Sequence, residues 1–255
     1  RYTRAMKRFR TVLLALFWLG LGTLLGFGIQ FLPGPIKLGE DSALLISSSA
    51  AQTVQVTLEP GNIILAQPAQ PGGTVFVFYP GGLVAPQAYE FMARALASQG
   101  ITVAIPAVPL ELAVLSPNRA NDVKRLLESK KLTVSKFVVG GHSLGGAMAA
   151  QYAAGNAVDG LVLMGAYPAG NSNLSSKRFP VLNLAAQFDG VAEGAKVRDG
   201  LNRLPAGTQV TLLEGGVHSF FGRYGPQKGD GTPTVTRAEF EDRLLERLTA
   251  FLEGI

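Results

Sequence analysis

The chain has 255 residues, 47% of them hydrophobic, a length that suits one α/β domain with an appendage. It contains no cysteine, which excludes disulfides, thiolate metal sites and a cysteine nucleophile. Five of the 23 basic residues are Arg1, Arg4, Lys7, Arg8 and Arg10, so the remaining 18 balance the 18 acidic residues. This neutrality beyond residue 10 argues against nucleic-acid binding by the folded domain.

The N-terminal segment has the pattern of a membrane anchor. A basic flank at 1–10 precedes residues 11–32, which carry no charge and are long enough to cross a hydrocarbon core as a transmembrane helix. The flank predicts a single-pass protein with a cytoplasmic N-terminus and the rest of the chain on the periplasmic or extracytoplasmic side. A cleaved signal peptide is the alternative, although its apolar region usually spans only about 7–15 residues. Residues 33–52, which begin with Pro33-Gly-Pro35, are expected to form a linker.

Residues 53–255 predict one domain of alternating strands and helices. A hairpin comes first, with strands at 53–58 and 63–66 around a Pro-Gly-Asn turn. Six more strands follow, at 74–79, 102–105, 136–140, 160–164, 179–185 and 209–213. Helices are expected at 86–99, 116–130, 144–154, 192–204 and 237–252, the second with Ser116 as its N-cap and Pro117 in its first turn. Strands that are apolar without alternation indicate an α/β fold with a mostly parallel, doubly wound sheet of about eight strands, covered by helices on both faces.

A possible nucleophile lies where the strand at 136–140 meets the next helix. Gly141-His-Ser-Leu-Gly145 matches G-x-S-x-G, a sharp turn that presents a serine hydroxyl above the sheet edge. The glycines allow the backbone and neighbouring elements to approach closely. An ordinary strand-to-helix turn with Ser143 as N-cap is the alternative.

A serine nucleophile needs a base, and the chain has only two histidines. His142 adjoins Ser143 in the turn and is expected to point away from its reacting face. That leaves His218, just beyond the last predicted strand, unless it is a surface-loop histidine.

The base in turn needs an orienting carboxylate. Asp189 follows the preceding strand, and the order Ser143, Asp189, His218 is that of α/β-hydrolases. Asp189 could instead be a turn aspartate before Gly190. Glu214 is a less suitable acid, because it lies on the same strand end as His218.

Backbone amides should stabilise the oxyanion. Leu144 is expected to supply one, and the loop after Tyr79 a second, with Gly82 preferred to Leu83. The segment between the strands at 160–164 and 179–185 is too short for a lid domain, which predicts an open site. Four residues could offer apolar contacts to a substrate or could equally be packing residues: Leu110, Phe220, Phe221 and Tyr224.

Residues from about 53 to 255 resemble an α/β-hydrolase of the serine esterase or lipase type, and are most similar to its compact dienelactone-hydrolase-like branch. The motifs that carry the resemblance are Tyr79-Pro-Gly-Gly82, Gly141–Gly145, Asp189-Gly190 and His218–Asp230. The resemblance implies Ser143 as nucleophile, Asp189 as acid and His218 as base. Dienelactone hydrolases proper use cysteine as the nucleophile, so their substrate does not carry over.

The sequence therefore predicts a membrane-anchored serine hydrolase that cleaves small-molecule or lipid carboxylic esters through an acyl-enzyme. We expect no cofactor, no metal and no nucleic-acid partner. Two alternatives remain, a non-catalytic binding or assembly module on the same scaffold and an acyltransferase with the same triad. The sequence leaves the substrate and the oligomeric state open.

Overall fold

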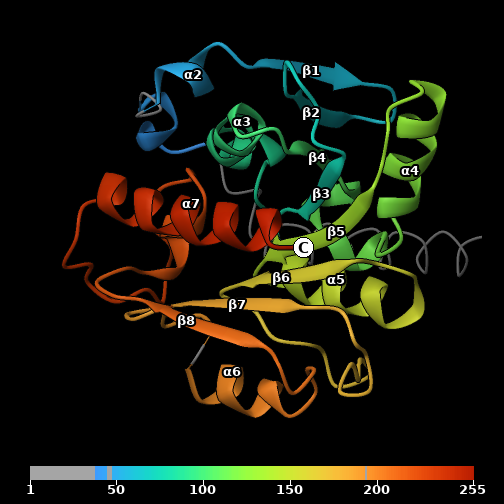
Figure 1. Ribbon diagram of the computed structural model, residues 1–255. Coiled ribbons are helices and arrows are strands. Elements are labelled where there is room, and N and C mark those ends of the chain that lie inside the picture. The colour runs from blue at the N-terminus through green and yellow to red at the C-terminus, as the bar shows by residue number, and fades with distance from the viewer. Residues whose placement is uncertain (1–37, 45–47, 193) are drawn as a thin grey trace, which may run out of the picture. The chain divides into compact units, whose positions relative to one another are not determined.

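The computed structural model describes residues 38–44, 48–192 and 194–255 (Figure 1). The basic flank at 1–10 and the predicted transmembrane helix at 11–32 lie outside the described residues. Within the described ranges, no helix combines the length and the hydropathy that a membrane span requires.

Eight strands form one sheet, in the order β1-β2-β4-β3-β5-β6-β7-β8. β1 and β2 form an antiparallel hairpin, β2 is also antiparallel to β4, and all other neighbours are parallel. The predicted mixed, mostly parallel sheet is confirmed. The strands are β1 (Gln55–Glu59), β2 (Ile63–Gln67), β3 (Thr74–Tyr79), β4 (Thr102–Pro106), β5 (Lys136–His142), β6 (Gly160–Met164), β7 (Val181–Ala186) and β8 (Gln209–Leu213).

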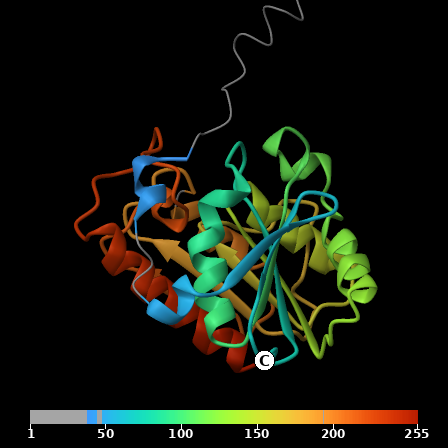
Figure 2. The same ribbon diagram turned by 90° about the horizontal axis from the view of Figure 1, so that it is seen from above.

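Helices cover both faces of this sheet (Figures 1 and 2). α3 (Glu90–Ser98) and α7 (Arg237–Glu253) pack on one face, and α4 (Ala120–Ser129), α5 (Leu144–Gly155) and α6 (Gly194–Leu201) lie on the other. Successive strand residues point to opposite faces, so the phenylalanines of β3 join the α3–α7 cluster and its valines the α4–α5 cluster. Two-sided burial explains why these strands are continuously apolar.

The helix predicted at 116–130 begins later than the sequence indicates. The prediction of Ser116 as N-cap is wrong, because residues 117–119 form a turn and α4 starts at Ala120. The Tyr79 hydroxyl accepts a hydrogen bond from the Ala120 amide (2.9 Å) and donates one to the Pro117 carbonyl (2.7 Å). A side chain from β3 thus caps the helix, which local sequence could not show.

Short helical turns complete the structure. Two of them, η1 (Glu40–Ala43) and α2 (Ser49–Gln52), fall in the segment predicted to be a linker. Ala51 of this segment is fully buried, and Asp41 forms an ion pair with Arg237 of α7 (2.6 Å). The remaining turns are η2 (Pro86–Tyr89), η3 (Pro109–Glu111), η4 (Ala113–Leu115) and η5 (His218–Phe221).

The strand order places a crevice at the centre of the sheet. From β3 the chain crosses through α3 to β4 on one side, and then through α4 to β5 on the other side of β3. Ligands of open α/β sheets bind at such a reversal, beyond the carboxyl ends of the strands. The loops that leave these ends of β3 and β5 are the predicted oxyanion loop and the turn that holds Ser143.

Candidate active site

Ser143 occupies a strained turn between β5 and α5. Its φ is 54° and its ψ −123°, a conformation that non-glycine residues adopt rarely and at a cost. A Cβ atom on Gly145 would lie 2.2 Å from the carbonyl oxygens of Tyr79 and Pro80, so only glycine fits there. The partly exposed Ser143 side chain makes no capping hydrogen bond, contrary to the N-cap alternative. The turn instead matches the sharp geometry expected around a nucleophile.

His218 and Asp189 form a buried pair. His218 Nδ1 lies 2.7 Å from Asp189 Oδ2, and the two side chains are 1% and 4% exposed, so His218 is not a surface-loop histidine. Asp189 Oδ1 accepts hydrogen bonds from the amides of Val191 (2.9 Å) and Ala192 (2.7 Å), which fixes the carboxylate. Glu214, the other acid considered, is exposed.

The pair determines which nitrogen of His218 can act. An ionised carboxylate only accepts, so Nδ1 carries the proton and Nε2 of the neutral ring presents a lone pair. Nε2 is buried and has no hydrogen-bond partner among the described residues. A free acceptor nitrogen on a ring held by a carboxylate is the arrangement that a general base needs.

The ends of β5, β6 and β7 bring the three predicted residues together. The Ser143 amide donates to the Met164 carbonyl (3.0 Å), and a Cβ atom on the next residue, Gly165, would lie 3.0 Å from His218 Nδ1. Gly165, with φ of 51°, thus lets the His218–Asp189 pair approach the turn. The structure contains no direct Ser143–His218 hydrogen bond, which in many hydrolases tightens only when substrate binds.

Two amides face the expected oxyanion position. Leu144 begins α5, so its amide has no intrahelical acceptor. Gly82 lies against it, since a Cβ atom there would be 3.1 Å from Leu144 Cδ2. Leu83, the second choice, donates its amide to the Glu111 carbonyl (2.7 Å), whereas no described residue accepts from the Gly82 amide. The geometry therefore favours Leu144 and Gly82.

His142 has a different place from the one the sequence indicated. Its ring centroid lies 4.3 Å from that of His218, so it contacts the candidate base. The Tyr89 hydroxyl accepts a hydrogen bond from the Gly81 amide (3.0 Å) and donates to His142 Nδ1 (2.9 Å). Burial, and then the neighbouring His218, lower the pKa of His142 well below its ordinary value. A neutral His142 adds no positive charge beside a His218 that must itself become charged.

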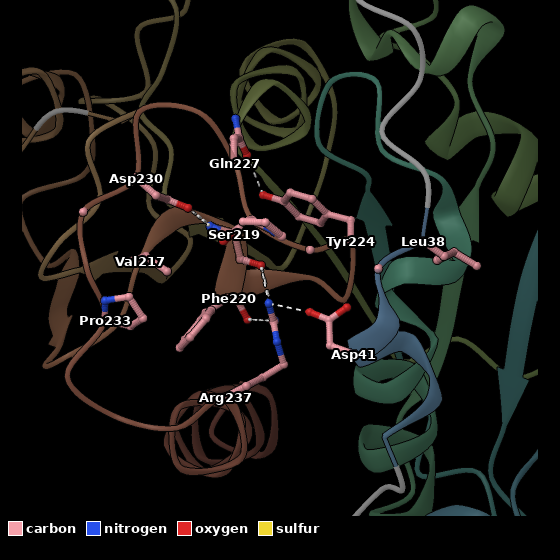
Figure 3. Close-up of a pocket in the computed structure, with 14 residues that line it drawn as sticks. Leu38, Asp41, Val217, Ser219, Phe220, Tyr224, Gln227, Asp230, Pro233 and Arg237 are labelled. Atoms are coloured by element: carbon pink, nitrogen blue, oxygen red, sulfur yellow. Dashed lines mark hydrogen bonds and ion pairs between the residues drawn. The ribbon is translucent and has the colours of Figure 1, made fainter.

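The four predicted pocket residues are not gathered in one place. Phe221 is fully buried against Phe240 in the core, and Leu110 is 78% exposed on η3. Phe220 and Tyr224 line a cavity of about 740 Å³ whose lining does not include Ser143 (Figure 3). No group of three or more potential metal ligands occurs within the described ranges.

Comparison with known proteins assigns the family. The sequence profile of the family described as "Alpha/beta hydrolase family" matches residues 75–242, more than half of the chain. The chain belongs to this family. A comparison with curated proteins finds no match.

Solved structures of other alpha/beta hydrolases and esterases have the same fold. Carboxyl esterase 2 from the fungus Tuber melanosporum superposes with a TM-score of 0.60 at 15% identity, covering 88% of this chain and 92% of that one. The esterase domain of a Rhodothermus marinus protein gives 0.55 at 14% identity, covering 78% and 96%. Dienelactone hydrolase from Anabaena variabilis gives 0.54 at 15% identity, covering 79% and 96%. At these identities the likeness concerns the fold.

The sequence reasoning missed Tyr89, Gly165 and Asp230. Tyr89 ends a predicted helical segment with no polar motif around it, so nothing local marks its buried hydroxyl. Gly165 directly follows a strand, where a glycine could have indicated a close approach. Asp230 closes the stretch from His218 that carries much of the family resemblance, and that position was a usable signal.

Proposed function

We propose that this alpha/beta hydrolase is a serine esterase that cleaves carboxylic esters through an acyl-enzyme. The observation that carries the proposal is the Asp189–His218 pair, which leaves Nε2 of a neutral imidazole free beside the strained turn of Ser143. In the proposal Ser143 is the nucleophile, His218 the base and Asp189 the residue that fixes its tautomer.

The reaction has two stages. Ser143 Oγ attacks the ester carbonyl while His218 Nε2 takes its proton, and the amides of Leu144 and Gly82 donate to the oxyanion that forms. The C–O bond to the alcohol then breaks, the alcohol leaves with the proton from Nε2, and an acyl-enzyme remains. Water attacks the acyl carbonyl with His218 again as base, and the acid and free Ser143 are released.

The surroundings of the site favour esters with an apolar acyl or alcohol group. Residues 165–180 contain turns but no helix or strand, so no lid domain is inserted between β6 and β7. The η3–η4 segment, which contacts the oxyanion loop through Glu111, exposes three apolar side chains. They are Leu110 at 78%, Val114 at 52% and Leu115 at 54%.

Membrane attachment is a separate part of the proposal. It rests on the uncharged residues 11–32 and on the five basic residues before them. An anchor with this charge pattern would place residues 33–255 on the periplasmic or extracytoplasmic side, where esters derived from lipids are within reach. Extraction of membranes with alkaline carbonate should leave the full chain in the pellet and release a variant that begins at residue 38.

The enzymatic proposal is tested by hydrolysis of p-nitrophenyl esters of increasing acyl length. We expect turnover by the wild type, with a preference for apolar acyl chains, and none by Ser143→Ala with an unchanged circular dichroism spectrum. Turnover by Ser143→Ala would overturn the assigned nucleophile. Esters of an added alcohol among the products would identify acyl transfer, whereas failure of the wild type to react with any ester would favour a non-catalytic scaffold.

A further inference from the structure

The backbone of the turn that carries His218 is held by a carboxylate on its amide side. Asp230 Oδ1 accepts a hydrogen bond from the His218 amide (2.7 Å), and Oδ2 accepts one from the Ser219 amide (2.9 Å). Asp230 lies in the loop between η5 and α7 and contacts no atom of the His218 ring in these bonds (Figure 3). Both carboxylate oxygens are therefore committed to two consecutive amides of one turn, and such charge-assisted bonds are the stronger kind.

An arginine holds the same turn on its carbonyl side. Arg237 Nη1, from the first residue of α7, donates to the carbonyl oxygens of Gly222 (2.8 Å) and Ser219 (3.3 Å). Arg237 Nη2 is bound in turn by Asp41 Oδ2 at 2.6 Å, and the guanidinium lies over the Phe220 ring, 4.5 Å from its centroid (Figure 3). Its side chain is only 10% exposed, so water screens these contacts little.

These two residues together restrain η5 from opposite directions. His218 reaches the site from a short 3₁₀ turn and has no long helix or strand to fix its backbone. A ring that must keep Nδ1 on Asp189 and Nε2 toward Ser143 tolerates little backbone movement, because a displacement of about 1 Å can cost about 100-fold in rate. The fold alone would leave this turn less constrained than the Ser143 turn, which β5 and α5 hold at both ends.

We propose that Asp230 and Arg237 are positioning residues that hold the His218 turn in the geometry needed for proton transfer. The inference deepens the proposed esterase function and rests on it for the step that is affected. It also gives the segment around Asp41 a role, since that residue orients Arg237. Neither Asp230 nor Arg237 touches the reacting atoms.

The test compares Asp230→Asn with a matched control, Asp159→Asn. Asp159 Oδ2 accepts a hydrogen bond from the Phe137 amide (2.7 Å) at the start of β5, the end of that strand away from Ser143. Both aspartates are partly buried and both bind backbone amides. Asparagine keeps the size of the side chain but turns an NH₂ group toward an amide donor at position 230. Arg237→Lys serves as a second variant, because it keeps the charge and loses the forked donors.

Two readouts separate the inference from the proposed function. One is the far-downfield proton resonance of His218 Nδ1–H, which is assigned by its loss in His218→Gln and needs no substrate. The other is the rate at which a fluorophosphonate labels Ser143. For Asp230→Asn and Arg237→Lys we expect the resonance to broaden and the labelling rate to fall about 10- to 100-fold, whereas Asp159→Asn keeps both.

The outcomes are distinct. Asp230→Asn and Arg237→Lys proteins that fold, keep a sharp His218 resonance and label at the wild-type rate would overturn the positioning role. Equal losses in Asp159→Asn would also overturn it, because they would reveal a general effect of stability. If the wild type does not label but its resonance still depends on Asp230, the esterase proposal fails and the restraint of the His218 turn stands.

Discussion

Replacement of Tyr89 by phenylalanine should destabilise the protein more than the loss of one hydroxyl usually does. The Tyr89 side chain is fully buried, and its hydroxyl serves both the Gly81 amide (3.0 Å) and His142 Nδ1 (2.9 Å). Its removal leaves a buried donor and a buried acceptor without partners, each at about 1–3 kcal/mol. We therefore expect the free energy of unfolding to fall by about 2–5 kcal/mol, a loss that a domain of ordinary stability survives.

The matched control is Tyr152→Phe. The Tyr152 hydroxyl makes one bond, to Asn121 Oδ1 at 2.7 Å, on the α4–α5 side of the sheet. Urea denaturation should show a loss of about 1 kcal/mol for this variant, with unchanged fluorophosphonate labelling. Tyr89→Phe should also label more slowly, because the Gly81 amide anchors the loop that presents Gly82. Equal stabilities and equal labelling rates for the two variants would refute the reasoning.

Three further outcomes follow from the site. Asp189→Asn should lower kcat for a p-nitrophenyl ester by about 10⁴-fold, because the amide favours the wrong tautomer of His218. The folded-state pKa of His142 is lowered, so the unfolded chain binds the proton first. The unfolding free energy should thus fall by up to about 1.4 kcal/mol per pH unit below about pH 6.5, and less steeply in His142→Gln, by urea titration at each pH. Gly165→Ala, with φ of 51° and a Cβ 3.0 Å from His218 Nδ1, should lower both the thermal midpoint and the labelling rate.

Strands were predictable where the sequence determines burial on both faces. Thr74–Tyr79, Gly160–Met164 and Gln209–Leu213 occupy the predicted ranges, because runs of β-branched and apolar residues suit a two-sided sheet. β5 extends beyond its predicted end at Gly140, since Gly141 and His142 find partners in β3 and β6. Such ends depend on neighbours that are distant in the sequence.

The same division holds for the site. Ser143, Asp189 and His218 could be predicted because each follows a strand, and parallel strands place their carboxyl ends at one edge. The residues around them could not be, because their roles depend on contacts between separate elements. Tyr89 reaches the site from the start of α3, and Arg237 acts on η5 from the first residue of α7. His142, judged by its neighbour in the chain, was assigned the wrong surroundings.

The most direct test of the account is the site at which a fluorophosphonate reacts. Mass spectrometry of the labelled protein and its peptides should find one adduct, on Ser143, whose rate of formation falls steeply in His218→Gln. An adduct at another serine, or a His218→Gln protein that labels Ser143 at the wild-type rate, would contradict the account.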